Sequence, residues 1–237
     1  MIRAALSALV LCYASAAMAV ECRLALVLAI DVSSSVDADE DALQRSGLAA
    51  ALIAPEVQRA VFSTDLPVAL AAYEWSGRYN QQILVDWTLI RAPADLLSVA
   101  EAIGRSQRGT TEFPTAMGYA LGYGANLLRR APACLFRTLD MAGDGENNEG
   151  FPPPTAYAEF PFDGVTVNGL VVNAADFEAE VDLITFYRDQ VLRGPGAFLE
   201  VAQGFRDYER AMRRKLEREL AAQSVGNLRP VPASKPG

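Results

Sequence analysis

The aliphatic run from Leu24 to Ile30 constrains the fold of this chain more than any other segment. Its sequence, LALVLAI, contains no polar side chain and stops at Asp31. A strand with apolar side chains on both faces is typical of a parallel sheet that helices cover on two sides. We therefore expect an α/β domain in which this strand lies between two layers of helices.

The remainder of the chain alternates predicted strands and helices. The link from Ser76 to Gln81 is too short for a parallel crossover and favours an antiparallel hairpin. The sequence thus predicts a doubly wound, mostly parallel six-stranded sheet with one antiparallel edge strand and helices on both faces. Beyond the first strand, we expect strands at 66–73, 82–89, 134–142, 165–172 and 197–201, and helices at 37–54, 93–103, 115–128, 175–192 and 205–220.

Two proline-containing segments are expected to interrupt this alternation. Pro55 is predicted to end the first helix, because the residue before a proline disfavours the helical conformation. The segment between strands 134–142 and 165–172 contains the prolines 152–154 and is predicted to be a long loop. Its acidic part, 146–149, is expected to be a solvated loop, with a role at the rim of a ligand site or in contact with a partner as the alternative.

The first 19 residues have the pattern of an export signal. Arg3 precedes an apolar run that ends in the small-x-small sequence Ala-Met-Ala at 17–19. The run is too short to span a membrane, and a signal peptide explains it better than a buried helix does. We expect a signal peptide at 1–19, one domain at 20–221, a disordered tail at 222–237, and a periplasmic or secreted protein without a membrane span.

Composition disfavours several classes of function. The formal charge of −8, which becomes −9 when Arg3 leaves with the signal peptide, disfavours binding to nucleic acid or anionic lipid. The chain has no histidine, which removes the usual catalytic triads and the commonest general base. Cys22 and Cys134 remain after the signal peptide, and such a pair in an exported protein suggests a disulfide, with two buried free thiols as the alternative.

A motif with the chemistry of a metal site follows the first strand. Ligands of open parallel sheets gather at the carboxyl ends of the strands, where Asp31 lies. Asp31, Ser33 and Ser35 supply one carboxylate and two hydroxyls, which suit a hard cation such as Mg²⁺, although these residues could instead cap the next helix. A second carboxylate, Asp144, ends another apolar strand between two glycines and favours the metal site.

This combination resembles the von Willebrand factor type A domains over residues 22–220. Their metal-ion-dependent adhesion site joins Asp-x-Ser-x-Ser, a loop threonine and a later strand-end aspartate. The resemblance implies Thr115 as that threonine, because TAMGYAL at 115–121 is similar to the family's Thr-x-x-Gly-x-Ala-Leu; Thr111 and Thr110 are alternatives. The full implied ligand set is Asp31, Ser33, Ser35, Thr115 and Asp144, with Mg²⁺, Mn²⁺ or Ca²⁺ as the ion.

The resemblance also has consequences for the cysteines. The family's strand order places the strands that contain Cys22 and Cys134 side by side, and each cysteine precedes its strand-end aspartate by a similar number of residues. A Cys22–Cys134 disulfide is therefore implied at the pole opposite the metal. Segments 162–170 and 206–212 resemble an exported bacterial branch of the family whose function is unknown.

The implied function is that of an exported protein-binding module for adhesion or scaffolding, which captures an Asp or Glu of a partner protein at its metal ion and is not an enzyme. A magnesium-dependent hydrolase is one alternative, but phosphatases of the haloacid dehalogenase type need an aspartate where Ser33 stands. A structural interaction domain that needs no metal is the other. The residues do not indicate an oligomeric state.

Overall fold

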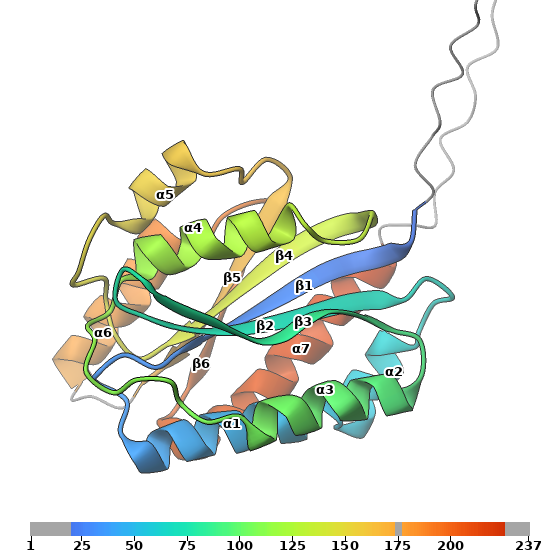
Figure 1. Cartoon of the computed structure of the whole chain (residues 1–237), viewed down its shortest axis with the longest axis horizontal. Coiled ribbons are helices and arrows are strands. Elements are labelled where there is room, and N and C mark those ends of the chain that lie inside the picture. The colour runs from blue at the N-terminus through green and yellow to red at the C-terminus, as the bar shows by residue number, and fades with distance from the viewer. Residues whose placement is uncertain (1–19, 174–176, 226–237) are drawn as a thin grey trace, which may run out of the picture.

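The computed structural model describes residues 20–173 and 177–225 (Figure 1). The predicted signal peptide at 1–19 lies outside the described residues, as does segment 226–237 of the predicted tail. The last helix, α7 (Tyr208–Val225), includes the first residues of that tail. No helix in the described part of the chain is long and apolar enough to cross a membrane.

The described residues contain one six-stranded sheet in the order β3-β2-β1-β4-β5-β6. The strand β3 pairs antiparallel with β2 at one edge, and the other pairs are parallel, which confirms the predicted sheet. The strand β1 is buried along its whole length, as its unbroken apolar sequence predicts. The strands are β1 (Cys22–Asp31), β2 (Val68–Ser76), β3 (Asn80–Ile90), β4 (Cys134–Gly143), β5 (Val165–Val172) and β6 (Leu199–Ala202).

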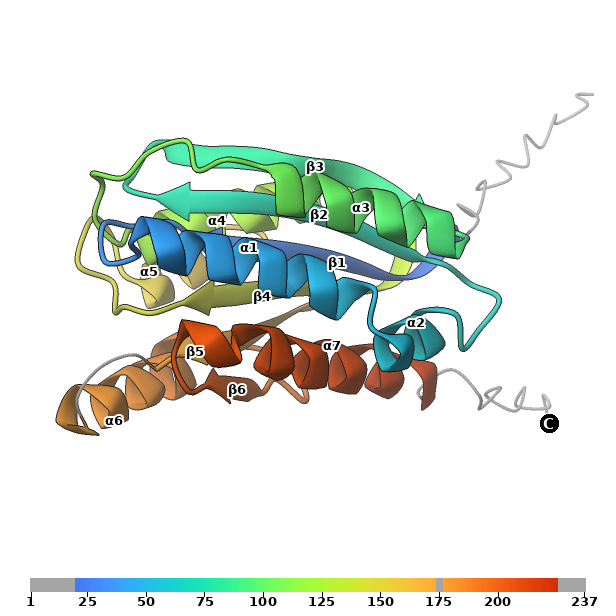
Figure 2. The same ribbon diagram turned by 90° about the horizontal axis from the view of Figure 1, so that it is seen from below.

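Helices cover both faces of this sheet, and each layer has its own apolar core (Figures 1 and 2). Alternate side chains of β1 point into the two cores: Leu26 and Leu28 into one, Val27 and Ala29 into the other. The first core lies under α1 (Ala38–Leu52), α2 (Pro55–Val61), α3 (Pro93–Arg105) and α7. The second lies under α4 (Met117–Leu128), α5 (Pro153–Glu159), α6 (Phe177–Phe186) and the π-helical turn Tyr187–Val191.

Two helices were not predicted, and both begin with proline. Pro55 opens α2 instead of only ending α1, and Pro153 opens α5 inside the segment expected to be a loop. Proline is well tolerated in the first helical turn, because the N–H that it lacks has no partner there. Buried Val57 and Ala156 then hold these short helices on the core.

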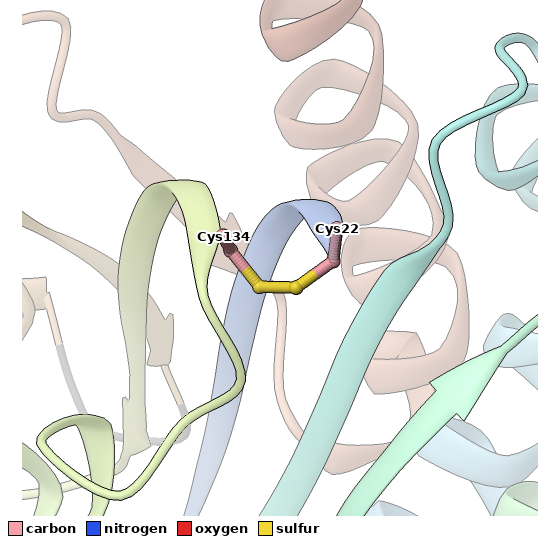
Figure 3. Close-up of a disulfide and its surroundings, with 2 residues drawn as sticks. All are labelled: Cys22 and Cys134. Carbon is pink, nitrogen blue, oxygen red and sulfur yellow. A yellow bond between two sulfur atoms is a disulfide. The ribbon is translucent and has the colours of Figure 1, made fainter. Parts of the chain in front are cut away.

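The implied disulfide is present. Cys22 and Cys134 are register partners in the parallel pair β1 and β4, and their sulfur atoms are bonded (Figure 3). The bond joins the amino-terminal ends of these two strands. The opposite ends of the same strands carry Asp31 and Asp144.

Candidate metal site

The sheet topology brings the two strand-end aspartates together. Asp31 is the last residue of β1, and Asp144 directly follows β4. The two strands are parallel neighbours, and Ile30 pairs with Ala142 at their carboxyl ends. Because the chain continues to β2 on one side of β1 and reaches β4 on the other, strand order reverses here, where α/β proteins commonly bind ligands.

Hydrogen bonds join all five predicted site residues into one cluster. The Ser33 N–H donates to Asp31 Oδ1 at 2.8 Å, and the Ser35 hydroxyl donates to Asp144 Oδ1 at 2.8 Å. The hydroxyl oxygens of Ser33 and Ser35 lie 3.2 Å apart, and the Thr115 hydroxyl donates to Ser33 Oγ at 3.2 Å. Two carboxylates and three hydroxyls thus converge at the carboxyl ends of the central strands β1 and β4.

Thr115 is the threonine that the structure places in this cluster. It is buried, whereas Thr111 is exposed and Thr110 is half-buried. The helix α4 begins only at Met117, so Thr115 precedes its first turn and its hydroxyl is directed at Ser33. The resemblance therefore selected the threonine that contacts the other site residues.

The loop after Asp144 fixes Thr115, which its sequence did not reveal. The Asn148 side chain accepts a hydrogen bond from the Thr115 N–H at 2.9 Å, and the Asn148 N–H donates to the Thr115 carbonyl at 3.0 Å. Asn147 accepts from the Gly118 N–H at 3.2 Å. The segment favoured as a solvated loop thus joins Asp144 to the start of α4, which agrees with the alternative expectation that it lies at the rim of the site. Asparagine side chains are good acceptors for the free N–H groups at helix starts, and this is the signal that was overlooked.

Arg108 is a second residue that the sequence did not reveal. Its guanidinium group donates to the carbonyls of Val32 at 2.7 Å and Ser33 at 2.6 Å, and also to that of Val36. The Gln44 side chain donates to the Asp31 carbonyl at 2.7 Å. These bonds pair four backbone carbonyls of the turn 31–36 without using its carboxylate and hydroxyl groups, which bond to one another within the cluster.

A buried ionic network connects this region to the sheet. Arg45 of α1 forms ion pairs with Asp41 at 2.9 Å and with Glu74 of β2 at 2.6 Å. Glu74 also accepts a hydrogen bond from the Gly109 N–H at 2.8 Å, and Arg45 donates to Ser106 at 2.6 Å. The loop that carries Arg108 is therefore held on both α1 and β2.

Burial makes both site carboxylates reluctant to ionise. It raises the pKa of Asp31 to about 8, with the charge of Asp144 as the second cause, although hydrogen bonds from Ser33 act in the opposite direction. Burial also raises the pKa of Asp144, and the hydrogen bond from Ser35 opposes this shift. Asp31 Oδ2 is buried without a hydrogen-bond partner among the described residues. A cation at this position would compensate both features.

The donor set fits a hard divalent cation. Carboxylate and hydroxyl oxygens are the ligands that Mg²⁺ and Ca²⁺ prefer. Within residues 20–173 and 177–225, no group of three or more His, Cys, Asp or Glu side chains is placed to hold a metal. An ion at this site would therefore depend on the serine and threonine hydroxyls as well as on the two aspartates.

Comparisons with known proteins agree with this fold. The chain matches the model of a family described as "Protein of unknown function (DUF1194)" over residues 21–224. No curated protein matches it. A von Willebrand factor type A protein from Catenulispora acidiphila is similar, with a TM-score of 0.56 and 17% identity over 85% of this chain and 43% of that chain.

Two further structures are similar. Proximal thread matrix protein 1 from the mussel byssus, with a zinc-occupied MIDAS motif, has a TM-score of 0.59 and 14% identity over 86% of this chain and 48% of that chain. The vWF domain of the type V pili tip protein Mfa5 from Porphyromonas gingivalis has a TM-score of 0.56 and 11% identity over 91% of this chain and 99% of that chain. This chain spans less than half of the mussel and Catenulispora proteins. The fold is that of a von Willebrand factor type A domain.

Proposed function

The chain belongs to the family described as "Protein of unknown function (DUF1194)", and we propose that it is an exported module that binds a partner protein through a divalent metal ion. The observation that carries this proposal is the unpartnered, buried Oδ2 of Asp31 within a cluster of two carboxylates and three hydroxyls. Such an oxygen is expensive to bury unless a cation or a donor faces it.

The proposed ligand set consists of residues that meet at the carboxyl ends of β1 and β4. Mg²⁺ suits these oxygen donors, with Mn²⁺ or Ca²⁺ as alternatives. The zinc-occupied MIDAS motif of the mussel byssus protein supports a divalent ion in this fold. The side chains that would hold the ion, directly or through water, are Asp31, Ser33, Ser35, Thr115 and Asp144.

Capture of a partner follows from the balance of charge. When bound, the ion supplies an electrophilic coordination position, which suits a carboxylate oxygen from an Asp or Glu of the partner. Ser33, Ser35 and Thr115 contribute neutral oxygens, so they add no negative charge that would repel this carboxylate. Arg108 holds the backbone of the Ser33 turn in place.

We propose a binding role and not a hydrolytic one. The position two residues after Asp31 holds Ser33, whose N–H and hydroxyl are engaged within the cluster. A serine hydroxyl cannot replace a carboxylate as general base, and the chain has no histidine that could take that role. The description of Mfa5 as a pili tip protein supports a role in surface interactions for a related fold.

Export is part of the same proposal. The Cys22–Cys134 disulfide supports an oxidising compartment, because such bonds persist mainly in the periplasm and outside the cell. The signal-peptide pattern at 1–19 supports the same location. We place the protein in the periplasm or outside the cell, with a protein partner and not a nucleic acid.

Isothermal titration of Mg²⁺ into the wild-type domain and the Asp31→Ala variant tests the metal site. Wild type should release or absorb heat with one-site saturation, and Asp31→Ala should not. Asp65→Ala, which changes an exposed aspartate in the loop before β2, is the matched control and should bind like wild type. Equal heats for wild type and Asp31→Ala would contradict the proposal.

A pull-down from periplasmic extract tests the partner. Immobilised wild-type domain should retain a protein in Mg²⁺ and release it into EDTA, and Thr115→Ala should retain less of it. Retention that is unchanged by EDTA would support an interaction domain that needs no metal.

A further inference from the structure

A second unpartnered group lies beside the candidate metal site. The hydroxyl of Tyr187 is buried and, like Asp31 Oδ2, has no hydrogen-bond partner within the described ranges. Both residues are 0% exposed. Leaving a buried polar group without a partner lowers the stability of the fold. Two such groups at one site require an explanation that the packing of the fold does not supply.

Gly143 shows that the two groups border the same small space. A Cβ atom added to Gly143 would lie 2.8 Å from Asp31 Oδ2 and 2.8 Å from the Tyr187 hydroxyl oxygen. Gly143 is not among the glycines with positive φ, so its backbone conformation is open to other residues. What this position requires is the absence of a side chain, which leaves room between the carboxylate and the hydroxyl.

The local structure holds the Tyr187 ring on the sheet. Tyr187 begins the π-helical turn Tyr187–Val191, which continues α6. The ring lies against Gly169 of β5, where an added Cβ would come within 2.8 Å of Cδ1 of the ring. Turns of this kind are frequent at functional sites, because the extra residue per turn redirects a side chain.

When a cation at the site keeps Asp31 ionised, the Tyr187 hydroxyl can act toward this carboxylate only as a donor. Burial, followed by the nearby charges of Asp31 and Asp144, raises the pKa of Tyr187 well above its usual range. Tyr187 therefore keeps its proton, and a protonated phenol beside an unpartnered carboxylate oxygen is a natural hydrogen-bond donor.

We propose that Tyr187 is a positioning residue of the metal site, whose hydroxyl donates to Asp31 Oδ2, directly or through one water molecule, across the space left by Gly143. This inference rests on the proposed metal site. A hydrogen bond to a ligating carboxylate fixes its orientation, and loss of such bonds commonly lowers metal affinity about 10- to 100-fold. The contact also connects the segment between β5 and β6 to the site.

Tyr187→Phe tests this role, and Tyr208→Phe provides a matched control. Tyr208 is another fully buried tyrosine with a hydroxyl unpartnered among the described residues, but the carboxylate charge that raises its pKa is that of Asp140 and not of the site aspartates. In titrations with Mg²⁺, Tyr187→Phe should raise Kd at least about tenfold, and Tyr208→Phe should leave it unchanged. Without metal, Tyr187→Phe should still unfold in one cooperative transition, so that a raised Kd reports on the site and not on loss of the fold.

Gly143→Ala is the second variant, and it keeps the inference testable if Tyr187→Phe fails to fold. The added methyl group would contact both Asp31 and Tyr187, so Mg²⁺ affinity should fall. If Mg²⁺ binds wild type and Tyr187→Phe equally well, the positioning role is overturned while the metal site stands. If wild type itself binds no Mg²⁺, the proposed function fails and this inference fails with it.

Discussion

Replacing Asp31 by asparagine should stabilise the metal-free protein, and the gain should grow with pH. Asparagine keeps the shape of the side chain, and its Oδ1 can still accept the hydrogen bond from Ser33. Asparagine cannot ionise. In wild type, burial and the charge of Asp144 make the ionised form of Asp31 unfavourable. The variant should therefore be more stable than wild type in EDTA while it loses Mg²⁺ binding.

The pKa of Asp31 sets the direction and size of this effect. The folded pKa of about 8 exceeds the 3.8 of an unperturbed aspartate, so between these values the native state holds a proton that the unfolded state has released. Wild-type stability therefore falls as pH rises through this window, by at most about 1.4 kcal/mol per pH unit. Over the whole window, the upper limit of the loss is about 6 kcal/mol. The asparagine variant lacks this contribution.

Urea denaturation of both proteins in EDTA at pH 5, 7 and 9 measures the difference. The free energy of unfolding of Asp31→Asn should exceed that of wild type by an amount that increases from pH 5 to pH 9. Saturating Mg²⁺ at pH 9 should stabilise wild type only, because the ion takes the place of the proton. Parallel pH profiles for the two proteins in EDTA would refute the assignment of this pH-dependent loss of stability to Asp31.

Three further predictions concern the disulfide and the site. Replacing Cys22 and Cys134 by serine should lower the free energy of unfolding by about 5 kcal/mol, from the closed separation of 112 residues, and dithiothreitol should destabilise only wild type. Thr115→Val should weaken Mg²⁺ binding in calorimetry, whereas Thr111→Val should not. Arg108→Met should raise the Kd for Mg²⁺ about tenfold, because it frees the carbonyls of the 31–36 turn; an unchanged Kd would show that the turn holds its shape alone.

Local sequence patterns predicted the sheet well because each strand contains apolar and β-branched residues and is separated from the next by turn or helix signals. Strand β5 has the predicted bounds of 165–172, and the hairpin of β2 and β3 follows from the short link between them. The two proline-led helices were missed because proline ends one helix and begins another with equal ease. Pro55 does both, and only the tertiary contact of Val57 with the core distinguishes these roles.

The candidate site was predictable only where its residues follow a spacing. Asp31, Ser33 and Ser35 alternate along one turn, and the pattern is visible without a structure. Arg108 acts on backbone carbonyls 72 to 76 residues away, and any residue type can offer a carbonyl. Tyr187 borders the same small space as Asp31 from the segment between β5 and β6, through a π-helical turn that no local pattern predicts.

The disulfide and the candidate site act on the same pair of strands. Two buried carboxylates at the carboxyl ends of β1 and β4 repel each other whenever both ionise, which favours separation of these strands. The Cys22–Cys134 bond joins the other ends of the same strands and fixes their register, since its cysteines are direct partners. A register slip of one residue would turn the Asp31 side chain toward the opposite face of the sheet. The bond thus holds Asp31 beside Asp144 while no cation offsets their charges, so reduction should weaken Mg²⁺ binding as well as stability.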